Sequence, residues 1–151
     1  MNYHYNNPRM NRTSMMFTNY PGFLEDLKKA IKDERQTIIL YKKLYEAAPT
    51  ETAKYSIKTA LKDEKVHNKK LTELYKKLTG YEPDIQLEEV DFYHFYDVLR
   101  KAFLDEVKAF EFYKEMYLST KCPGIRDLLY NIQHDEMEHA ALFNWVHAEI
   151  K

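Results

Sequence analysis

Six ionisable side chains recur in this chain with a spacing that suits metal ligation. Each half contains a Glu, a second Glu thirty residues later, and a His three residues after that. The residues are Glu34, Glu64 and His67 in the first half and Glu106, Glu136 and His139 in the second, each 72 residues after its counterpart. Four carboxylates and two imidazoles in this order form the ligand set of a two-metal site inside a four-helix bundle. The pattern therefore predicts that the chain holds two metal ions.

The residues around these positions repeat as well. Ala-Ile-Lys-Asp-Glu at 30–34 matches Ala-Phe-Leu-Asp-Glu at 102–106, and the Glu-x-x-His pairs are preceded by Asp63 and Asp135. One Glu-x-x-His motif would mean little in a Glu-rich chain, whereas two in matching surroundings indicate a duplicated functional unit. The alternative is an old duplication that preserved only helix-surface charge, and the hydrophobic pattern argues against it.

The six residues fall within apolar stripes that advance in steps of three and four residues, which predicts helices with one buried face. The predicted helices run from about Phe23 to Ala47, from Glu51 to Leu78, from Asp91 to Ser119, and from Pro123 to the C-terminus. Pro49 and Gly80 are suited to end the first two helices. Tyr45 and Ile150 end the first and fourth stripes, and both are predicted to be buried.

The spacing also predicts how the helices pair. Glu34 and Glu64 lie about thirteen residues on either side of the first turn, so each is roughly 20 Å from it and the two lie level in an antiparallel hairpin. The link from Gly80 to Val90 is long enough, at about 3.3–3.6 Å per residue, to run the length of a helix. We therefore expect an all-α fold, a ferritin-like four-helix bundle made of two antiparallel helix hairpins joined by a long crossover.

The predicted core is acidic and has no side-chain counter-charge. An ionised carboxylate in an apolar core is costly unless it is paired or bound to a metal, and four at one level repel one another. Two divalent cations would balance four carboxylates. Oxygen-rich ligands with one His per metal suit iron or manganese better than zinc in a closed structural site. The alternative is a water-filled polar layer that only fixes the register of the helices.

Further residues are placed to support the ligands. Asp63 and Asp135 could each accept the N–H of an imidazole that does not face the metal, on the facing helix. Tyr41 and Tyr113 lie seven residues after Glu34 and its counterpart and could donate hydrogen bonds to ligand carboxylates. The alternatives are ordinary surface charge for the two Asp residues and core packing for the two Tyr residues.

Composition narrows the class of protein. The 151 residues fit one domain, with a bundle at 23–151 and a flexible N-terminal tail or arm at 1–22 that could dock on a partner subunit. A net charge of −1 gives no electrostatic footprint for nucleic acid or an anionic membrane, and no run is apolar enough for a membrane span. Cys122 is the only cysteine, so a disulfide framework or a Cys-based metal site is excluded within one chain. We expect a cytoplasmic protein.

The aromatic content predicts a homodimer. Thirteen Tyr and eight Phe are more than the four core stripes use. The surplus rings include Phe92, Tyr93, Phe95, Phe112 and Tyr130. A partner surface would keep such large apolar side chains out of water. The alternative is that they pack beneath the crossover and tail of a monomer.

Over residues 23–150, the ligand motif resembles the ferritin-like di-iron carboxylate superfamily, and is most similar to its rubrerythrin and bacterioferritin branches. The resemblance implies two Fe, alternatively Mn, per chain that react with O2 or peroxide. It also implies that Glu64 and Glu136 bridge the metals, that Glu34 and Glu106 each bind from one helix, and that His67 and His139 are terminal ligands. The expected function is a di-iron oxidoreductase that reduces peroxide or O2 while oxidising Fe²⁺ or an external donor.

Two departures from the rubrerythrin pattern affect this expectation. A rubredoxin-like domain needs two Cys pairs, which this chain lacks, so an electron donor must be a separate molecule. Rubrerythrins also have an additional Glu one turn after the third-helix ligand, where this chain has Ala109. The alternative functions are a non-catalytic iron-binding or iron-handling protein and a structural assembly protein built on the same bundle.

Overall fold

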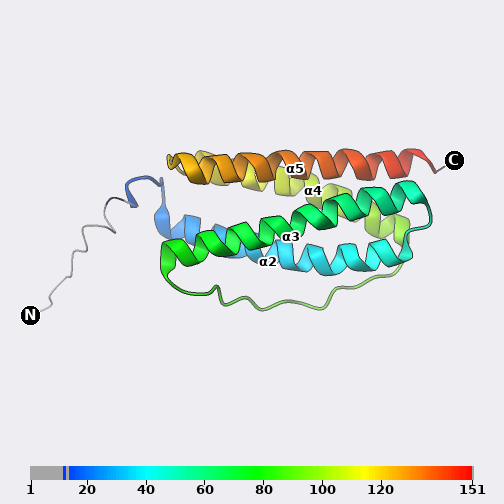
Figure 1. Cartoon of the computed structure of the whole chain (residues 1–151), viewed down its shortest axis with the longest axis horizontal. Coiled ribbons are helices and arrows are strands. Elements are labelled where there is room, and N and C mark those ends of the chain that lie inside the picture. The colour runs from blue at the N-terminus through cyan, green and yellow to red at the C-terminus, as the bar shows by residue number, and fades with distance from the viewer. Residues whose placement is uncertain (1–11, 13, 151) are drawn as a thin grey trace, which may run out of the picture.

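The computed structural model describes residues 12 and 14–150, so most of the predicted N-terminal tail lies outside the described residues. The described part forms four long helices, α2 (Tyr20–Ala47), α3 (Glu51–Thr79), α4 (Phe95–Leu118) and α5 (Pro123–Ala148). Figure 1 shows all four lying along the long axis, with the segment between α3 and α4 running back along the bundle. The prediction of an all-α bundle of two antiparallel hairpins joined by a long crossover is confirmed.

Local sequence explains three of the helix ends. The Asn19 side chain accepts a backbone N–H from the first turn of α2 at 3.0 Å, and Pro21 lies in that turn. The Thr50 hydroxyl accepts the N–H of Ala53 at 3.1 Å and begins α3 in the same way. Gly80 ends α3 at φ 80°, a left-handed conformation that costs other residues free energy.

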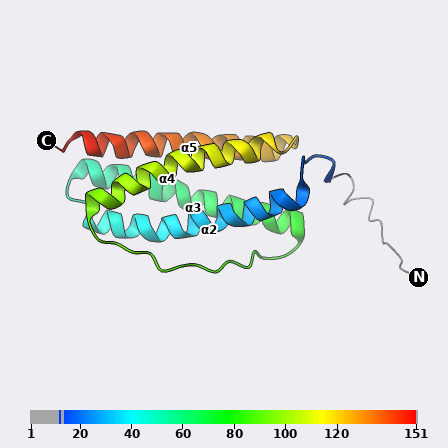
Figure 2. The ribbon, with the colours of Figure 1, turned by 180° about the vertical axis from the view of Figure 1, so that it is seen from behind.

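The predicted start of the third helix at Asp91 is wrong, because α4 begins four residues later, at Phe95. The crossover backbone is tied to α2 before that point, where Lys43 Nζ donates to the Val90 carbonyl at 2.6 Å. The chain remains non-helical through His94, the N-cap residue of α4. The crossover therefore spans residues 81–94, and Figure 2 shows it along the α2 side of the bundle.

The chain ahead of α2 packs on its own bundle. Phe17 is buried and forms an isolated antiparallel bridge with Thr120 in the turn between α4 and α5. Lys121 N donates to the Met16 carbonyl at 2.7 Å. The helix itself begins at Tyr20, three residues before its predicted start. Residues 16–20 thus belong structurally to the bundle.

The core consists of two apolar clusters with an ionisable layer between them. One cluster, near the turn between α4 and α5, includes Leu27, Ile31, Leu71, Met116 and Leu129. The other, toward the opposite end, includes Leu44, Ile57, Ala60, Leu99 and Phe143. On every helix the predicted metal ligands fall between these two sets of residues. The apolar clusters therefore hold all four helices together on both sides of the candidate site.

Two core predictions fail at helix ends. Tyr45 is 37% exposed and Ile150 is 47% exposed, because both lie where the bundle ends and no neighbouring helix covers them. Among the surplus aromatics, Phe92, Phe95 and Phe112 pack against the core clusters, while Tyr93 and Tyr130 are exposed. None of the helices in the described ranges is long and apolar enough to cross a membrane.

Candidate metal centre

The structure brings all six predicted ligands together in the middle of the bundle, and each is at most 3% exposed. They form two groups of potential ligands. These are Glu34, Glu64, His67 and Glu136, and Glu64, Glu106, Glu136 and His139. Within each group, one ligand atom per residue lies within 4.8 Å of all the others, so each group could hold a metal ion. Glu64 and Glu136 belong to both groups, which is where bridging carboxylates would lie.

The two imidazoles are oriented by carboxylates from the facing helix. Nε2 of His67 on α3 lies 2.8 Å from Asp135 Oδ2 on α5, and Nε2 of His139 on α5 lies 3.0 Å from Asp63 Oδ2 on α3. A carboxylate accepts a hydrogen bond, so Nε2 carries the proton in both rings. Nδ1 of each ring is then left to face the Glu residues, with a lone pair available once it is deprotonated.

Buried polar atoms without a hydrogen-bond partner are concentrated here. They include Glu34 Oε2, Glu64 Oε1, His67 Nδ1, Glu106 Oε2, Glu136 Oε1 and His139 Nδ1. His139 Nδ1 lies 3.0 Å from Glu64 Oε1, but without the alignment of a hydrogen bond. An unpaired buried polar group costs about 1–3 kcal/mol, and more when it is charged. Each of the six residues thus presents one unpaired atom to the others, and metal coordination would satisfy these atoms.

Two tyrosines cross between the repeats. The Tyr41 hydroxyl on α2 donates to Glu106 on α4, and the Tyr113 hydroxyl on α4 donates to Glu34 on α2. Burial, followed by the nearby carboxylates, raises the pKa of both Tyr hydroxyls. Both therefore remain protonated donors, and each fixes one oxygen of a Glu while the other oxygen stays free.

The cluster retains protons in the absence of metal. Burial, followed by the charge of Glu64, raises the pKa of Glu34 well above its usual value, and burial with three neighbouring carboxylates does the same for Glu136. Burial alone would lower the pKa of His67 and His139, but hydrogen bonds to the surrounding carboxylates outweigh it and raise both pKa values. A cation entering this layer would displace these protons.

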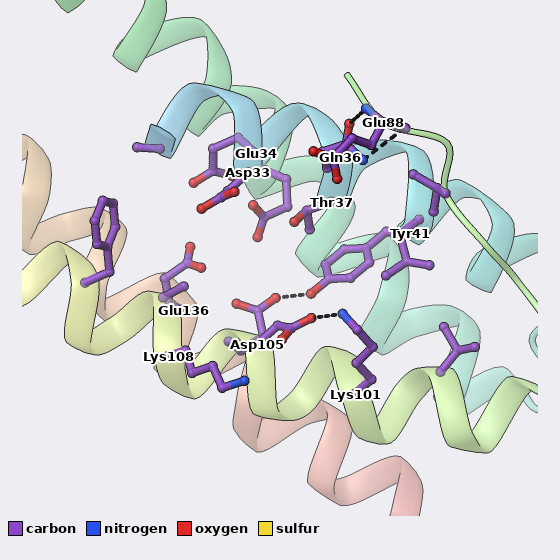
Figure 3. A pocket seen from close by; sticks show the side chains of 18 of the residues that line it. Asp33, Glu34, Gln36, Thr37, Tyr41, Glu88, Lys101, Asp105, Lys108 and Glu136 are labelled. Carbon is purple, nitrogen blue, oxygen red and sulfur yellow. Dashed lines mark hydrogen bonds and ion pairs between the residues drawn. The ribbon is translucent and has the colours of Figure 1, made fainter. Parts of the chain in front are cut away.

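A cavity of about 580 Å³ leads from the surface to this centre. It lies between α2, α4 and the crossover, and Glu34, Tyr41 and Glu136 face it in Figure 3. Two ion pairs line its surface end, Lys29–Asp33 at 2.5 Å and Lys101–Asp105 at 2.6 Å. The sequence analysis missed this opening. The Lys-x-x-x-Asp spacing of these pairs recurs after 72 residues, but it predicts only ion pairs along one helix and not an opening.

Comparisons with known proteins show relatives without an assigned activity. No protein-family model matches the chain. The uncharacterized protein YhjR of Bacillus subtilis is 28% identical over 123 residues, which cover 82% of this chain and 85% of YhjR. A solved structure of a hypothetical protein from Pyrococcus furiosus is 25% identical with a TM-score of 0.75, covering 83% of this chain and 88% of that one. The likeness extends over most of all three chains.

Proposed function

We propose that this chain is a ferritin-like di-metal oxidoreductase, similar to rubrerythrins, that reduces peroxide or O2 while oxidising Fe²⁺ or an external donor. The observation that carries this proposal is the pair of ligand groups that share Glu64 and Glu136. Their unpaired atoms converge from four helices, and every supporting hydrogen bond leaves those atoms free. A layer that served only helix register would have no need to leave six buried atoms without partners.

The donor set fits iron, with manganese as the alternative. Glu34 and His67 would bind one ion and Glu106 and His139 the other, with Glu64 and Glu136 between them. Two divalent ions would balance the four carboxylates, and the oxygen-rich donors with one imidazole each suit these metals. When bound, a pair of such ions would supply electrons to an oxidant.

The chain's own residues would orient the ligands and admit the oxidant. Asp63 and Asp135 keep the Nδ1 atoms of the imidazoles turned toward the centre. Tyr41 and Tyr113 hold the two Glu residues that belong to only one ligand group each. The cavity between α2 and α4 would let small molecules reach the carboxylate layer from solvent. Electrons would come from Fe²⁺ itself or from an external donor.

A second candidate function is iron binding without turnover. Ala109 favours it, because rubrerythrins have an additional Glu at this position and here a methyl group lines the cavity. The two candidates differ in what happens after ferrous iron is bound. Only an oxidoreductase would accelerate its oxidation by peroxide or O2.

Anaerobic loading with Fe²⁺, followed by stopped-flow mixing with H2O2 or O2, tests the proposal. We expect two Fe per chain by elemental analysis and an absorbance rise far faster than for free Fe²⁺. The double variant Glu64→Ala, Glu136→Ala should lose both metals, because it removes the two shared carboxylates. The matched control is Glu73→Ala, Glu138→Ala, which changes exposed residues of the same two helices. Full loading of the first variant overturns the site, and oxidation no faster than that of free Fe²⁺ favours iron binding alone.

A further inference from the structure

The cavity above the metal centre is larger than H2O2 or O2 requires. Its volume is about 580 Å³. One water occupies roughly 30 Å³ of the liquid, and H2O2 is only slightly larger. Pockets for organic ligands measure about 300–1,000 Å³. Two ions with bound water would fill only a small part of this space, which is sized for an organic molecule.

The wall of the cavity contains apolar residues from both α2 and α4. The apolar lining residues include Ala30, Leu40, Val98, Ala109 and Phe112. Burial of a hydrocarbon group against them is favourable by about 25 cal/mol per Å². Ala109 lies three residues after Glu106, on the same face of α4, and its counterpart in the first repeat is Thr37. Both side chains are small, so the space directly over the acids stays open.

The surface end of the cavity favours an uncharged ligand. Lys29 pairs with Asp33 and Lys101 pairs with Asp105, so the two lysines that flank the opening are neutralised. Glu88 of the crossover is likewise paired with Lys32. The other exposed charged residues of the lining, Lys108, Glu89 and Asp91, form no ion pair in the described part of the chain and carry one positive and two negative charges. An organic anion would therefore meet more carboxylates than cations here, which disfavours it relative to a neutral molecule.

We propose that the cavity takes an organic hydroperoxide, with its hydrocarbon group against the apolar wall and its peroxide group toward the carboxylate layer. This inference rests on the proposed peroxide reduction and specifies its substrate. The O–O bond of ROOH breaks as the molecule gains two electrons and two protons, giving ROH and water. The two electrons come from oxidation of two Fe²⁺ to two Fe³⁺.

The test compares cumene hydroperoxide with H2O2 on the iron-loaded protein. Ala109→Phe fills the cavity, and Ala47→Phe is the matched control at an exposed position outside it. We expect Ala109→Phe to lower kcat/KM for cumene hydroperoxide by about tenfold, because the added ring takes the space of the bulky group. The kcat/KM for H2O2 should change little. The inert alcohol 2-phenyl-2-propanol provides a second readout. It should perturb the methyl NMR signals of Ala30 and Val98 in the metal-free protein, and fail to do so in Ala109→Phe.

The outcomes separate this inference from the proposed function. Reduction of H2O2 but not of cumene hydroperoxide overturns the inference and leaves the function standing. An equal fall for both peroxides in Ala109→Phe also overturns it. If neither peroxide is reduced, the peroxide reduction in the proposed function fails and this inference fails with it, and the alcohol then decides only whether the cavity takes an organic ligand. No perturbation at Ala30 and Val98 would show that it does not.

A second, independent observation concerns the outer face of α5. An exposed stripe runs along it, formed by Tyr130, His134, Met137, Ala141, Trp145 and Ala148. The equivalent exposed positions on α3, 72 residues earlier, are Lys58, Lys62, Lys65, Lys69, Glu73 and Lys76. The two helices occupy corresponding places in the two repeats, yet one face is charged and the other mostly apolar. The charged face is what solvent exposure alone would produce, so the α5 face needs another explanation.

We infer that the α5 stripe pairs with the α5 stripe of a second copy, in antiparallel orientation about a two-fold axis near Met137. This register places Tyr130 of one copy opposite Trp145 of the other, and His134 opposite the small Ala141. A self-complementary patch of this kind is what a two-fold interface requires, and Tyr, Trp and Met are enriched in such interfaces.

Light scattering of the metal-loaded full chain tests the pairing. We expect twice the chain mass of 18.2 kDa. The double variant Trp145→Lys, Met137→Lys should be monomeric by light scattering and folded by circular dichroism. The control variant Glu73→Lys, Lys65→Met changes the equivalent positions of α3 and should remain dimeric. A wild-type mass of one chain at all concentrations, or a dimer that survives the α5 substitutions, overturns the inference. Tyr130→Lys provides a second disruption should the double variant not fold.

Discussion

Tyr41 on α2 donates its hydrogen bond to Glu106 on α4, and not to Glu34 seven residues before it on its own helix. The relation is reciprocal, because Tyr113 on α4 donates its hydrogen bond to Glu34 on α2. The imidazoles follow the same rule, since each is oriented by the Asp of the other repeat. Every ligand that has a support thus receives it from the other half of the chain.

Removal of one tyrosine hydroxyl should lower the unfolding free energy of the metal-free protein and the affinity for one metal ion. Tyr41→Phe leaves a Glu106 oxygen buried without a donor, which costs about 1–3 kcal/mol in unfolding free energy. Urea unfolding of the metal-free protein measures this, and Tyr55→Phe, at an exposed position, is the control. Because the hydroxyl serves one ligand group, one of two metal-binding steps should weaken in calorimetry. Equal weakening of both steps would argue against the pairing of Tyr41 with a single group.

The carboxylates behind the imidazoles should control metal affinity. Asp135→Asn keeps the size of the side chain but loses the charged acceptor for His67 Nε2–H, so the ring is held less firmly in the productive orientation. Loss of such a partner typically lowers metal affinity about 10–100-fold. Competition with a chelator measures the change, with Asp127→Asn on the exposed face of the same helix as control. An unchanged affinity would mean that Asp135 is ordinary surface charge.

Metal stabilisation should grow with pH. The pKa values of Glu34 and Glu136 are raised above the usual 4.5 in the folded, metal-free protein. A raised pKa contributes stability that is complete below the unfolded-state pKa and is lost as pH rises through the folded-state pKa. The metal-free fold is therefore weakened by rising pH, while the metal gains deprotonated ligands. The difference in Tm between loaded and metal-free protein should increase as the pH rises above the usual range of a Glu carboxyl. A constant or shrinking difference in scanning calorimetry would contradict this.

Loss of the acids should not simply destabilise the fold. Replacement of all four buried Glu residues by Gln removes like-charge repulsion from the metal-free core. We expect its Tm to be equal or higher, with no further rise on addition of metal. The control replaces four exposed acids by Gln, at Glu51, Glu73, Glu111 and Glu138. A large fall in the metal-free Tm of the first variant alone would mean that the acids serve a hydrogen-bond network in the fold itself.

Features that depend on helical periodicity were accessible from sequence. Glu34 and Glu64 could be aligned because both are counted from the same turn, and the 72-residue offset carried the result to the second hairpin. Features that depend on contacts between distant segments were not. The crossover that precedes α4 is tied to α2 by a hydrogen bond from Lys43 to Val90, 47 residues away in the sequence, and α4 begins only at Phe95. The stripe pattern also could not show that Tyr45 lies at the exposed end of α2 or that Ile150 lies past the end of α5 at Ala148.

The choice of partner for each support was likewise beyond the sequence. Periodicity placed Tyr41 and Asp63 on the correct faces, but which ligand each would meet depends on how the two hairpins cross. The cavity was missed for the same reason. Its walls come from α2, α4 and the crossover, and no local pattern shows that these three segments enclose a space.

Glu64 and Glu136 are shared between the two ligand groups, so the two repeated hairpins depend on each other for metal binding. Neither hairpin contains a complete ligand group. The group with Glu34 and His67 of the first hairpin also includes Glu136, and the group with Glu106 and His139 of the second hairpin also includes Glu64. The molecule is in effect two copies of one hairpin joined end to end. A peptide of a single hairpin would have to associate with itself to make the same centre. Cleavage within the crossover should accordingly give two fragments that bind metal together but not apart.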